Sequence, residues 1–390
     1  MPKRLNDIQS EVSSILRRVR SQGDEALCYY ARKFDGVNLA PGSLRVPGEK
    51  LKAAYRSVDE KARTALGCAE KRISGFHEAE YQRLPFQWQV GIEGLTVGQK
   101  ANPIDSVGLY IPGGRFAYPS TVLMTALPAK IAGVRRIVLV SPPGQLKNEV
   151  LAAAYLCGIK EFYQVGGAQA IAALAYGTRS IPKVDKVAGP GNRYVTEAKR
   201  QLYGVVGIDG LAGPSEIVVW MESGSDPVKA AHNLMAQAEH DPDARSYLIS
   251  QSKPLLEKVR NEVNPTMLKQ ISFEHKPSRR SAIARVNAIA PEHLYLMVSN
   301  PRSVVNEVCN AGAIFVGEQT PVALGDYVAG PSHVLPTKGS AKFSSGLSVK
   351  EFIKWTSVIE NRAAVNSEIF ESARILAEIE GLTHHLRSLQ

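Results

Sequence analysis

Hydrophobic residues change their spacing along the 390-residue chain, and each spacing predicts a kind of element. Apolar side chains three or four positions apart predict helices over 5–33 and around 47–80. Short polar and apolar alternations over 84–104 predict hairpin strands. Over 106–208 short apolar runs alternate with helical segments, and a second alternating run covers 217–316.

This repeated alternation of strands and helices predicts an α/β fold with doubly wound parallel sheets. A chain of 390 residues exceeds one ordinary core, so we expect two α/β domains. Beyond Leu324 glycine, proline and serine become dense, and residues 368–382 predict a helical tail. In doubly wound sheets, ligands bind beyond the carboxyl ends of the strands.

Composition places the chain among globular proteins, with 44% hydrophobic and 22% charged residues. The first residues are charged and contain no apolar segment, so we expect no signal peptide. No apolar run is long enough to cross a bilayer, and we predict a cytoplasmic protein without a membrane partner. The net charge is +10, but the basic residues are spread out and lack interleaved aromatics, which argues against nucleic acid as a partner. Four scattered cysteines indicate no zinc ribbon or redox pair.

Two glycine turns follow predicted strands and precede predicted helices. They are Gly-Gly-Ala-Gln at 166–169 and Gly-Pro-Gly-Asn at 189–192. Glycines let a ligand approach the backbone, and a helix N-terminus favours anionic groups such as phosphates. The usual dinucleotide fingerprint, Gly-x-Gly-x-x-Gly, is absent. Tight turns use the same residues for structural reasons alone, and that alternative stays open here.

Polar side chains able to bind a metal or move a proton lie in the second half of the chain. Gln237 and His240 are three apart in a predicted helix and therefore share a face. The segments 290–293, 325–333 and 383–385 add further histidines and acids. This pattern suggests a metal-assisted enzyme.

Each of these residues also has a structural explanation. His240 could be a capping or core histidine, and Asp326 could only organise a turn. Glu292 and His293 could end a surface helix, where the helix dipole favours a histidine. Ser120 could be the N-cap of the helix that follows it.

Eight segments together resemble the histidinol dehydrogenase family, in the family's order and over most of the chain. They include Val-Gly-Leu-Tyr-Ile-Pro-Gly-Gly at 107–114, Gln-Ala-Glu-His at 237–240 and Ala-Pro-Glu-His at 290–293. The other five are 119–124, 165–175, 189–192, 212–216 and 333–337.

The resemblance implies a zinc-dependent homodimer that oxidises L-histidinol to L-histidine in two NAD-dependent steps, the last stage of histidine biosynthesis. It implies one Zn²⁺ per subunit and active sites shared between subunits. The implied zinc ligands, which also contact substrate, are Gln237, His240, Asp326 and His385. The implied catalytic pair is Glu292 and His293, the further substrate contacts are Ser120, Ser215, His333 and Glu380, and the NAD contacts are Tyr110, Gln169 and Asn192.

The same resemblance implies two incomplete Rossmann-like domains, related to those of aldehyde dehydrogenases, with helical N- and C-terminal appendages. Residues 1–20 would form a helical arm, and 21–105 with 217–345 a discontinuous first α/β domain that holds the zinc site. Residues 106–216 would form the second α/β domain on the NAD side. The tail, 346–390, would cross to the partner subunit and bring Glu380 and His385 to its site.

The side chains suit this chemistry. A site with two imidazoles, a carboxylate and an amide oxygen is typical of catalytic rather than structural zinc. His293 can accept the alcohol proton as hydride leaves, because an imidazole ordinarily titrates near neutral pH. Glu292 can then activate the water that must add to the aldehyde before a second hydride leaves.

The sequence also departs from the family pattern. Arg115 and Phe116 stand where many members have a small residue, and Gly-Pro-Ser-His replaces the commoner Gly-Thr-Asn-His at 330–333. An extra arginine would suit an anionic substrate such as a sulfonated diol, which gives the alternative of a related zinc dehydrogenase with another hydroxyl substrate. A zinc hydrolase without NAD is a further alternative, against which the glycine turns argue.

Overall fold

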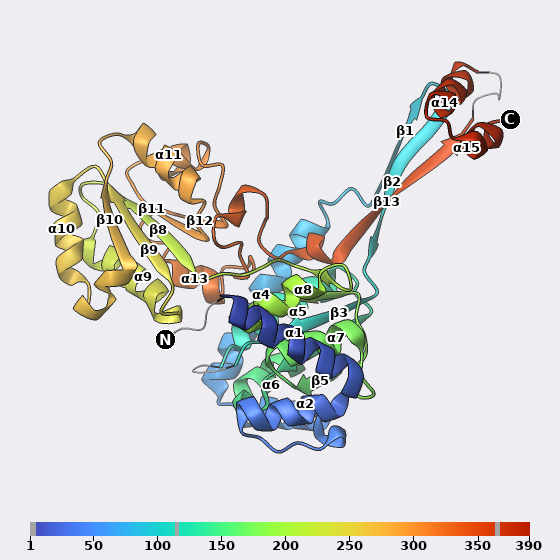
Figure 1. Cartoon of the computed structure of the whole chain (residues 1–390). Helices are drawn as coiled ribbons and strands as arrows, with labels where there is room; N and C mark the ends of the chain where they lie inside the picture. The colour runs from blue at the N-terminus through green and yellow to red at the C-terminus, as the bar shows by residue number, and fades with distance from the viewer. Residues whose placement is uncertain (1–4, 114–116, 363–366) are drawn as a thin grey trace. The chain divides into compact units, whose positions relative to one another are not determined.

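The computed structural model describes residues 5–113, 117–362 and 367–390, apart from the side chains of Leu5, Asn6, Gln145 and His240. The chain forms two compact units (Figure 1). Unit 1 comprises 1–81 and 104–352, and unit 2 comprises 82–103 and 353–390.

The first sheet of unit 1 is five-stranded and parallel, in the order β5-β4-β3-β6-β7. Its strands are β3 (Ser106–Tyr110), β4 (Arg136–Ser141), β5 (Glu161–Gln164), β6 (Lys186–Ala188) and β7 (Gly207–Ile208). Both faces are covered, which is why the strands are apolar almost throughout. The strand order reverses between β3 and β6, and the carboxyl ends of these two strands are the expected place for a ligand.

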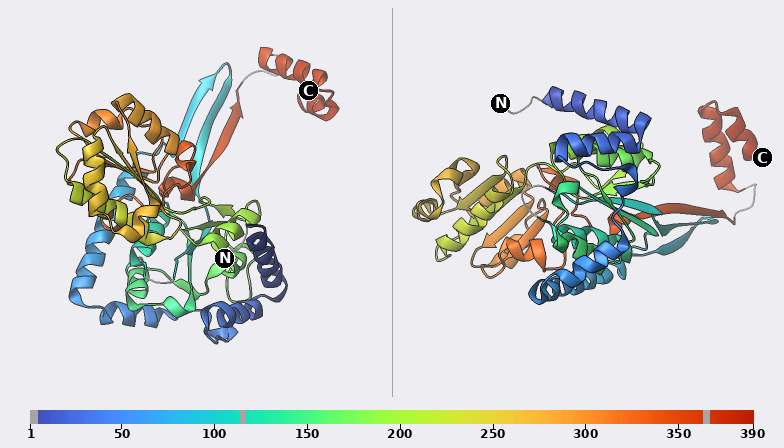
Figure 2. Two further views of the ribbon diagram at one scale, coloured as in Figure 1. Left: turned by 60° about the vertical axis from the view of Figure 1, so that its left-hand side comes forward. Right: turned by 90° about the horizontal axis from the view of Figure 1, so that it is seen from below.

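Helices cover both faces of this sheet (Figure 2). One face carries α1 and α2 packed on α7 and α8, where Val12, Val19 and Leu174 share a core. On the other face α5 and α6 pack together, and α4 and α3 pack against them. These helices are α1 (Leu5–Gln22), α2 (Asp24–Tyr30), α3 (Gly48–Ser57), α4 (Glu60–Tyr81), α5 (Pro119–Ile131), α6 (Asn148–Leu156), α7 (Gly167–Tyr176) and α8 (Arg193–Leu202).

The second sheet of unit 1 repeats this topology, in the order β10-β9-β8-β11-β12. Its strands are β8 (Glu216–Met221), β9 (Arg245–Ser250), β10 (Ile271–His275), β11 (His293–Met297) and β12 (Ala313–Val316). Alternate side chains of β8 enter different cores: Ile217 and Val219 face α9 and α10, whereas Val218 and Trp220 face α11 and α12. The helices are α9 (Pro227–His240), α10 (Lys253–Glu262), α11 (Arg279–Ile289), α12 (Pro301–Val305) and α13 (Val322–Tyr327).

Unit 2 is an antiparallel sheet of order β1-β2-β13 followed by two helices. Figure 2 shows β13 (red) beside the β1–β2 hairpin (cyan). The elements are β1 (Gln87–Ile92), β2 (Leu95–Pro103), β13 (Ile353–Asn361), α14 (Glu368–Ile379) and α15 (Thr383–Ser388). Short π or 3-10 turns complete the chain at Ala31–Asp35, Pro41–Ser43, Pro143–Gln145, Pro265–Gln270, Ser340–Lys342 and Val349–Phe352.

The predicted fold class is confirmed: two parallel α/β sheets with helical termini. Strand β13 was not predicted, and the predicted tail helix over 368–382 ends at Ile379 before a second short helix. The domain boundaries stay a prediction. None of the described helices combines the length and apolar character that a membrane span needs.

Candidate active site

Two central strands of the second sheet begin side by side and bring two glutamates together. Glu292 directly precedes β11, and Glu216 is the first residue of β8. The Glu216 N–H donates a hydrogen bond of 3.0 Å to Glu292 Oε2. Glu292 and His293 are both buried, with 6% and 5% of their surface exposed. The alternative that they end a surface helix is therefore wrong.

Burial dominates the electrostatics of Glu292. It is the largest of the effects that raise the pKa of this carboxyl from 4.5 to about 8. The negative charges of Asp326 and Glu216 also raise the pKa, whereas hydrogen bonds from the Glu216 N–H and the Ser215 side chain lower it. Burial also raises the pKa of Glu216, although the N–H groups of Lys338 and Gly339 oppose this. Glu292 is therefore a stronger base than an ordinary glutamate.

The His293 imidazole lies between two carboxylates. Its Nδ1 is 3.7 Å from Glu292 Oε2, and its Nε2 is 3.9 Å from Asp326 Oδ1. These distances exceed those of strong hydrogen bonds but are close enough for electrostatic stabilisation. Asp326, and Glu292 when it is ionised, can therefore stabilise the positive charge that the ring gains when it accepts a proton.

A pocket of about 240 Å³ lies between α9 and α13. Gln237 and Asp326 both line it, with His232, Asn233, Ala236, Pro321, Val322 and Ala323. Asn233 links the two helices, because its Oδ1 accepts a 3.1 Å hydrogen bond from the Val322 N–H. Helix α9 runs back along β8, so its last turn returns to the edge where β8 and β11 begin.

The residues facing this pocket suit a divalent cation. The Gln237 side chain offers an amide oxygen, and Asp326 offers a carboxylate with 24% of its side chain exposed. His240 is the last residue of α9, so the predicted shared helix with Gln237 is present, but its side chain lies outside the described part of the structure. Among the described His, Cys, Asp and Glu side chains, no group of three is gathered closely enough to hold a metal.

His333 connects Asp326 with helix α5. Its Nδ1 is 2.9 Å from the backbone oxygen of Asp326, and its Nε2 is 3.1 Å from Thr121 Oγ1. A carbonyl oxygen can only accept, so Nδ1 donates, and Nε2 of the neutral ring accepts from the threonine hydroxyl. Thr121 was missed by sequence reasoning because a buried threonine in an apolar helix has no distinctive pattern.

The predicted substrate contacts Ser120 and Ser215 lie next to residues already described. Ser120 neighbours Thr121 in α5, which begins at Pro119 with Tyr118 as its N-cap residue, so the expectation that Ser120 caps the helix was wrong. Ser215 directly precedes β8, and its side chain hydrogen-bonds Glu292.

The three predicted NAD contacts lie near the carboxyl ends of first-sheet strands. Tyr110 ends β3 and is buried; its hydroxyl accepts a 3.0 Å hydrogen bond from the Gly167 N–H, and burial raises its pKa to about 12. Gln169 is buried in the first turn of α7. Asn192 caps α8, because its Oδ1 accepts from the N–H groups of Tyr194 and Val195. Tyr110 and Asn192 thus have structural bonds whatever else they contact.

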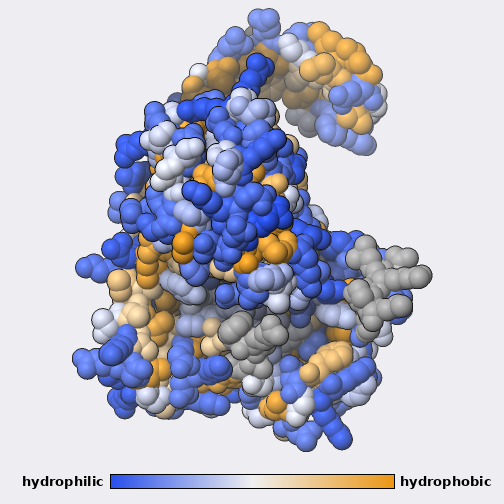
Figure 3. Space-filling model, turned by 90° about the vertical axis from the view of Figure 1, so that its left-hand side faces the viewer, coloured by the Kyte–Doolittle hydropathy of each residue, from blue (hydrophilic) through white to orange (hydrophobic). Residues whose placement is uncertain are grey.

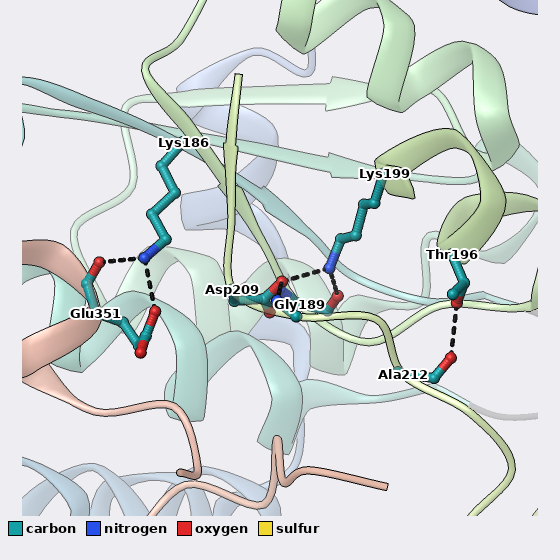
Figure 4. Close-up of polar contacts among 8 residues, drawn as sticks. Lys186, Gly189, Thr196, Lys199, Asp209, Ala212 and Glu351 are labelled. Carbon is teal, nitrogen blue, oxygen red and sulfur yellow. Dashed lines mark hydrogen bonds and ion pairs between the residues drawn. The ribbon is translucent and has the colours of Figure 1, made fainter. Parts of the chain in front are cut away.

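A buried ion pair next to Asn192 was also missed by sequence reasoning. Lys199 Nζ is 2.6 Å from both Asp209 Oδ1 and the Gly189 carbonyl (Figure 4). Only 3% of the lysine side chain and 8% of the aspartate side chain are exposed. Lys199 is at helical spacing from the buried Val195 and Leu202, but this spacing does not identify Asp209 as its partner.

Comparison with known proteins identifies the family. A family model described as histidinol dehydrogenase matches residues 2–390. The chain belongs to the histidinol dehydrogenase family. A histidinol dehydrogenase of Thermosynechococcus vestitus is 46% identical, over 99% of this chain and 93% of its own length. The crystal structure of histidinol dehydrogenase from Elizabethkingia anophelis matches with a TM-score of 0.92 and 33% identity, over 100% of this chain and 93% of that chain.

The aldehyde dehydrogenase relationship holds at the level of the fold. An acetylating aldehyde dehydrogenase from Geobacillus thermoglucosidasius has a TM-score of 0.51 and 12% identity, over 94% of this chain and 100% of that chain. The chain is therefore an oxidoreductase of the histidinol dehydrogenase family on an aldehyde-dehydrogenase-like scaffold.

Two predicted site residues of this histidinol dehydrogenase family member lie in unit 2. Glu380 follows α14, and His385 is in α15; both are exposed. Gly381 separates these helices with a positive φ of 69°, and Arg374 donates to the Leu389 carbonyl and joins the helices. Arg115 and Phe116, the departures near the expected pocket, lie outside the described residues.

Proposed function

We propose that this protein oxidises L-histidinol to L-histidine through L-histidinal, in two successive NAD-dependent hydride transfers, as the last step of histidine biosynthesis. The family match over residues 2–390 carries this proposal. The buried Glu292–His293 pair, beside a pocket lined by the Gln237 amide and the Asp326 carboxylate, supports it.

His293 is the proton acceptor in this scheme. As the alcohol C–H gives up its hydride, the O–H must lose a proton, and an imidazole accepts it readily. The Asp326 carboxylate, 3.9 Å from Nε2, stabilises the resulting imidazolium, and Glu292, 3.7 Å from Nδ1, adds to this when it is ionised.

Glu292 serves the second oxidation. An aldehyde has no O–H to ionise, so water must add first, and the added oxygen becomes part of the acid product. In its ionised form Glu292, whose pKa is raised to about 8, takes the proton from that water. Its hydrogen bonds to Ser215 and the Glu216 N–H fix the direction of the carboxylate.

The cofactors are one Zn²⁺ per subunit and NAD. When bound, zinc fixes the substrate's amine and imidazole nitrogens, and NAD takes up the hydride. Gln237, His240, Asp326 and His385 are the proposed metal ligands. Gln237 and Asp326 facing one pocket supports this set.

Further substrate and NAD contacts belong to the same proposal. Ser120, Ser215, His333 and Glu380 would contact L-histidinol. The proposed NAD contacts are Tyr110, Gln169 and Asn192, at the carboxyl ends of β3, β5 and β6, where helix N-termini favour phosphate groups.

A homodimer completes the active site in this proposal, with His385 and Glu380 donated by unit 2 of the partner. Unit 2 exposes several apolar side chains, and monomers rarely expose so much apolar surface in one place. This supports the proposal that a second copy of the chain covers them. The most exposed of them are Ile379 at 76%, Ile359 at 72%, Leu376 at 59% and Ile92 at 52%. Figure 3 shows apolar groups at the surface of the C-terminal helices at its top. We place the dimer in the cytoplasm, without nucleic acid or membrane partners.

One assay tests the scheme. The purified protein with L-histidinol and NAD should produce two NADH per substrate, followed by absorbance, and a chelator should abolish turnover. Absence of NADH with L-histidinol in the zinc-loaded protein would refute the proposal.

A further inference from the structure

Near each end of β6 a lysine binds one carboxylate and one backbone carbonyl (Figure 4). Lys186 belongs to the strand itself, and Lys199 belongs to helix α8. At the amino end, Lys186 Nζ is 2.6 Å from the Glu351 carboxylate and 2.6 Å from the Glu351 carbonyl. At the carboxyl end, Lys199 Nζ is 2.6 Å from the Asp209 carboxylate and 2.6 Å from the Gly189 carbonyl. The two differ in what they hold: Lys199 holds the first residue of the turn 189–192.

Both backbone polar groups of Gly189 are fixed by this pair. Its N–H donates to Asp209 Oδ2 at 2.7 Å, and its carbonyl accepts from Lys199. Gly189 has a φ of +111°, and a Cβ there would collide with the backbone carbonyl oxygen of Tyr110. The turn therefore needs a backbone conformation that side-chain-bearing residues rarely adopt, pressed against the end of β3.

Asp209 is also the first residue of the connector, defined as residues 209–215 between β7 and β8. Thr196 Oγ1 donates to the Ala212 carbonyl at 2.9 Å (Figure 4), and the Gly213 N–H donates to Thr337 Oγ1. The connector ends at Ser215, which hydrogen-bonds Glu292. Helix α8 thus holds the turn on one side and the connector on the other.

A buried ion pair is expensive to desolvate, and stability alone is a weak reason to have one. Here both charged side chains bind the backbone of Gly189 as well as each other. We propose that the Lys199–Asp209 pair is a positioning device for cofactor binding: it holds the Gly189 backbone so that the turn 189–192 presents Asn192 and the start of α8 to NAD. This inference rests on the proposed NAD-dependent function.

The test is Lys199→Met in the full-length, zinc-loaded protein, with Lys186→Met as the matched control. Each variant removes one lysine bond to a carboxylate and one to a backbone carbonyl near an end of β6, although Lys186 is on the strand and Lys199 is on helix α8. We expect K199M to raise the Kd for NADH, measured by fluorescence, at least tenfold and to raise the KM for NAD similarly. Its kcat at saturating NAD should stay within threefold, and K186M should leave the Kd within twofold.

Three outcomes are distinguishable. If the unsubstituted protein does not bind NADH, the proposed function fails. If it binds NADH and folded K199M binds equally well, while both lysine variants lower the Tm, the pair is only structural and this inference is overturned. If K199M does not fold, Asp209→Asn is tested in its place, because the asparagine amide oxygen can still accept a hydrogen bond from Lys199. An unchanged Kd for NADH in D209N would also overturn the inference.

Discussion

Replacing Glu292 by Gln should stabilise the protein while disabling it. Glutamine has nearly the same shape as a protonated glutamate, and its amide oxygen can still accept from the Glu216 N–H, which is 3.0 Å from Glu292 Oε2. The variant removes only the ability to ionise. Its effect on unfolding therefore depends on pH in a way that the structure fixes.

The sign follows from the raised pKa. Below pH 4.5 the carboxyl is protonated in the folded and unfolded states, so the two proteins should be equally stable. Between 4.5 and about 8 only the unfolded wild type ionises, so its stability falls relative to the variant, and above about 8 the difference is constant. At about 1.4 kcal/mol per pH unit, E292Q should gain under ~1 kcal/mol at pH 5, ~3 kcal/mol at pH 7 and at most ~5 kcal/mol above pH 8.

Urea denaturation at pH 5, 7 and 9 measures this difference. Zinc and NAD must be removed, because ligands that bind only the folded state add their own stabilisation. Glu274→Gln is a control of opposite sign: hydrogen bonds from Arg285 hold the pKa of Glu274 below its usual value, so E274Q should lose stability at neutral pH. A pH-independent difference for E292Q would refute our account of Glu292.

The other predictions use separate assays. His293→Ala should lower kcat by about 10³-fold with zinc content unchanged by atomic absorption, because it removes only the proton acceptor; loss of zinc would contradict this. Gln237→Ala should lower zinc stoichiometry, and full metal retention would remove Gln237 from the ligand set. Gly189→Ala should cost about 2–4 kcal/mol in thermal unfolding, since its Cβ would meet the Tyr110 oxygen. Thr121→Val should raise the KM for L-histidinol several-fold by releasing His333, and unchanged kinetics would make that bond irrelevant to binding.

The amino-acid pattern predicted the regular core well. Apolar runs such as 136–140 and the helical spacing of 5–33 give strands and helices close to those observed, because local spacing alone determines which face of an element can be buried. Strand β13 was missed since its side chains are almost all exposed, so it has no buried face to produce a hydrophobic pattern.

The candidate residues lie at opposite strand ends in the two sheets. Turns after β5 and β6 gave candidate residues at carboxyl ends, as expected for the first sheet. In the second sheet Glu292 and His293 lie at the amino edge, where α9 and α13 return. Helix direction relative to the strands decides this, and local sequence does not encode it.

By itself, the sequence determined the elements, the fold class and a set of polar residues able to perform proton transfer. Only the tertiary structure decided their surroundings: Glu292 is buried, which raises its pKa to about 8, and His333 Nε2 is hydrogen-bonded to Thr121. It also brought Lys199 and Asp209 together on the backbone of Gly189. Periodicity is a local property that one segment expresses alone. Burial and ion pairing depend on segments that meet only when the chain has folded.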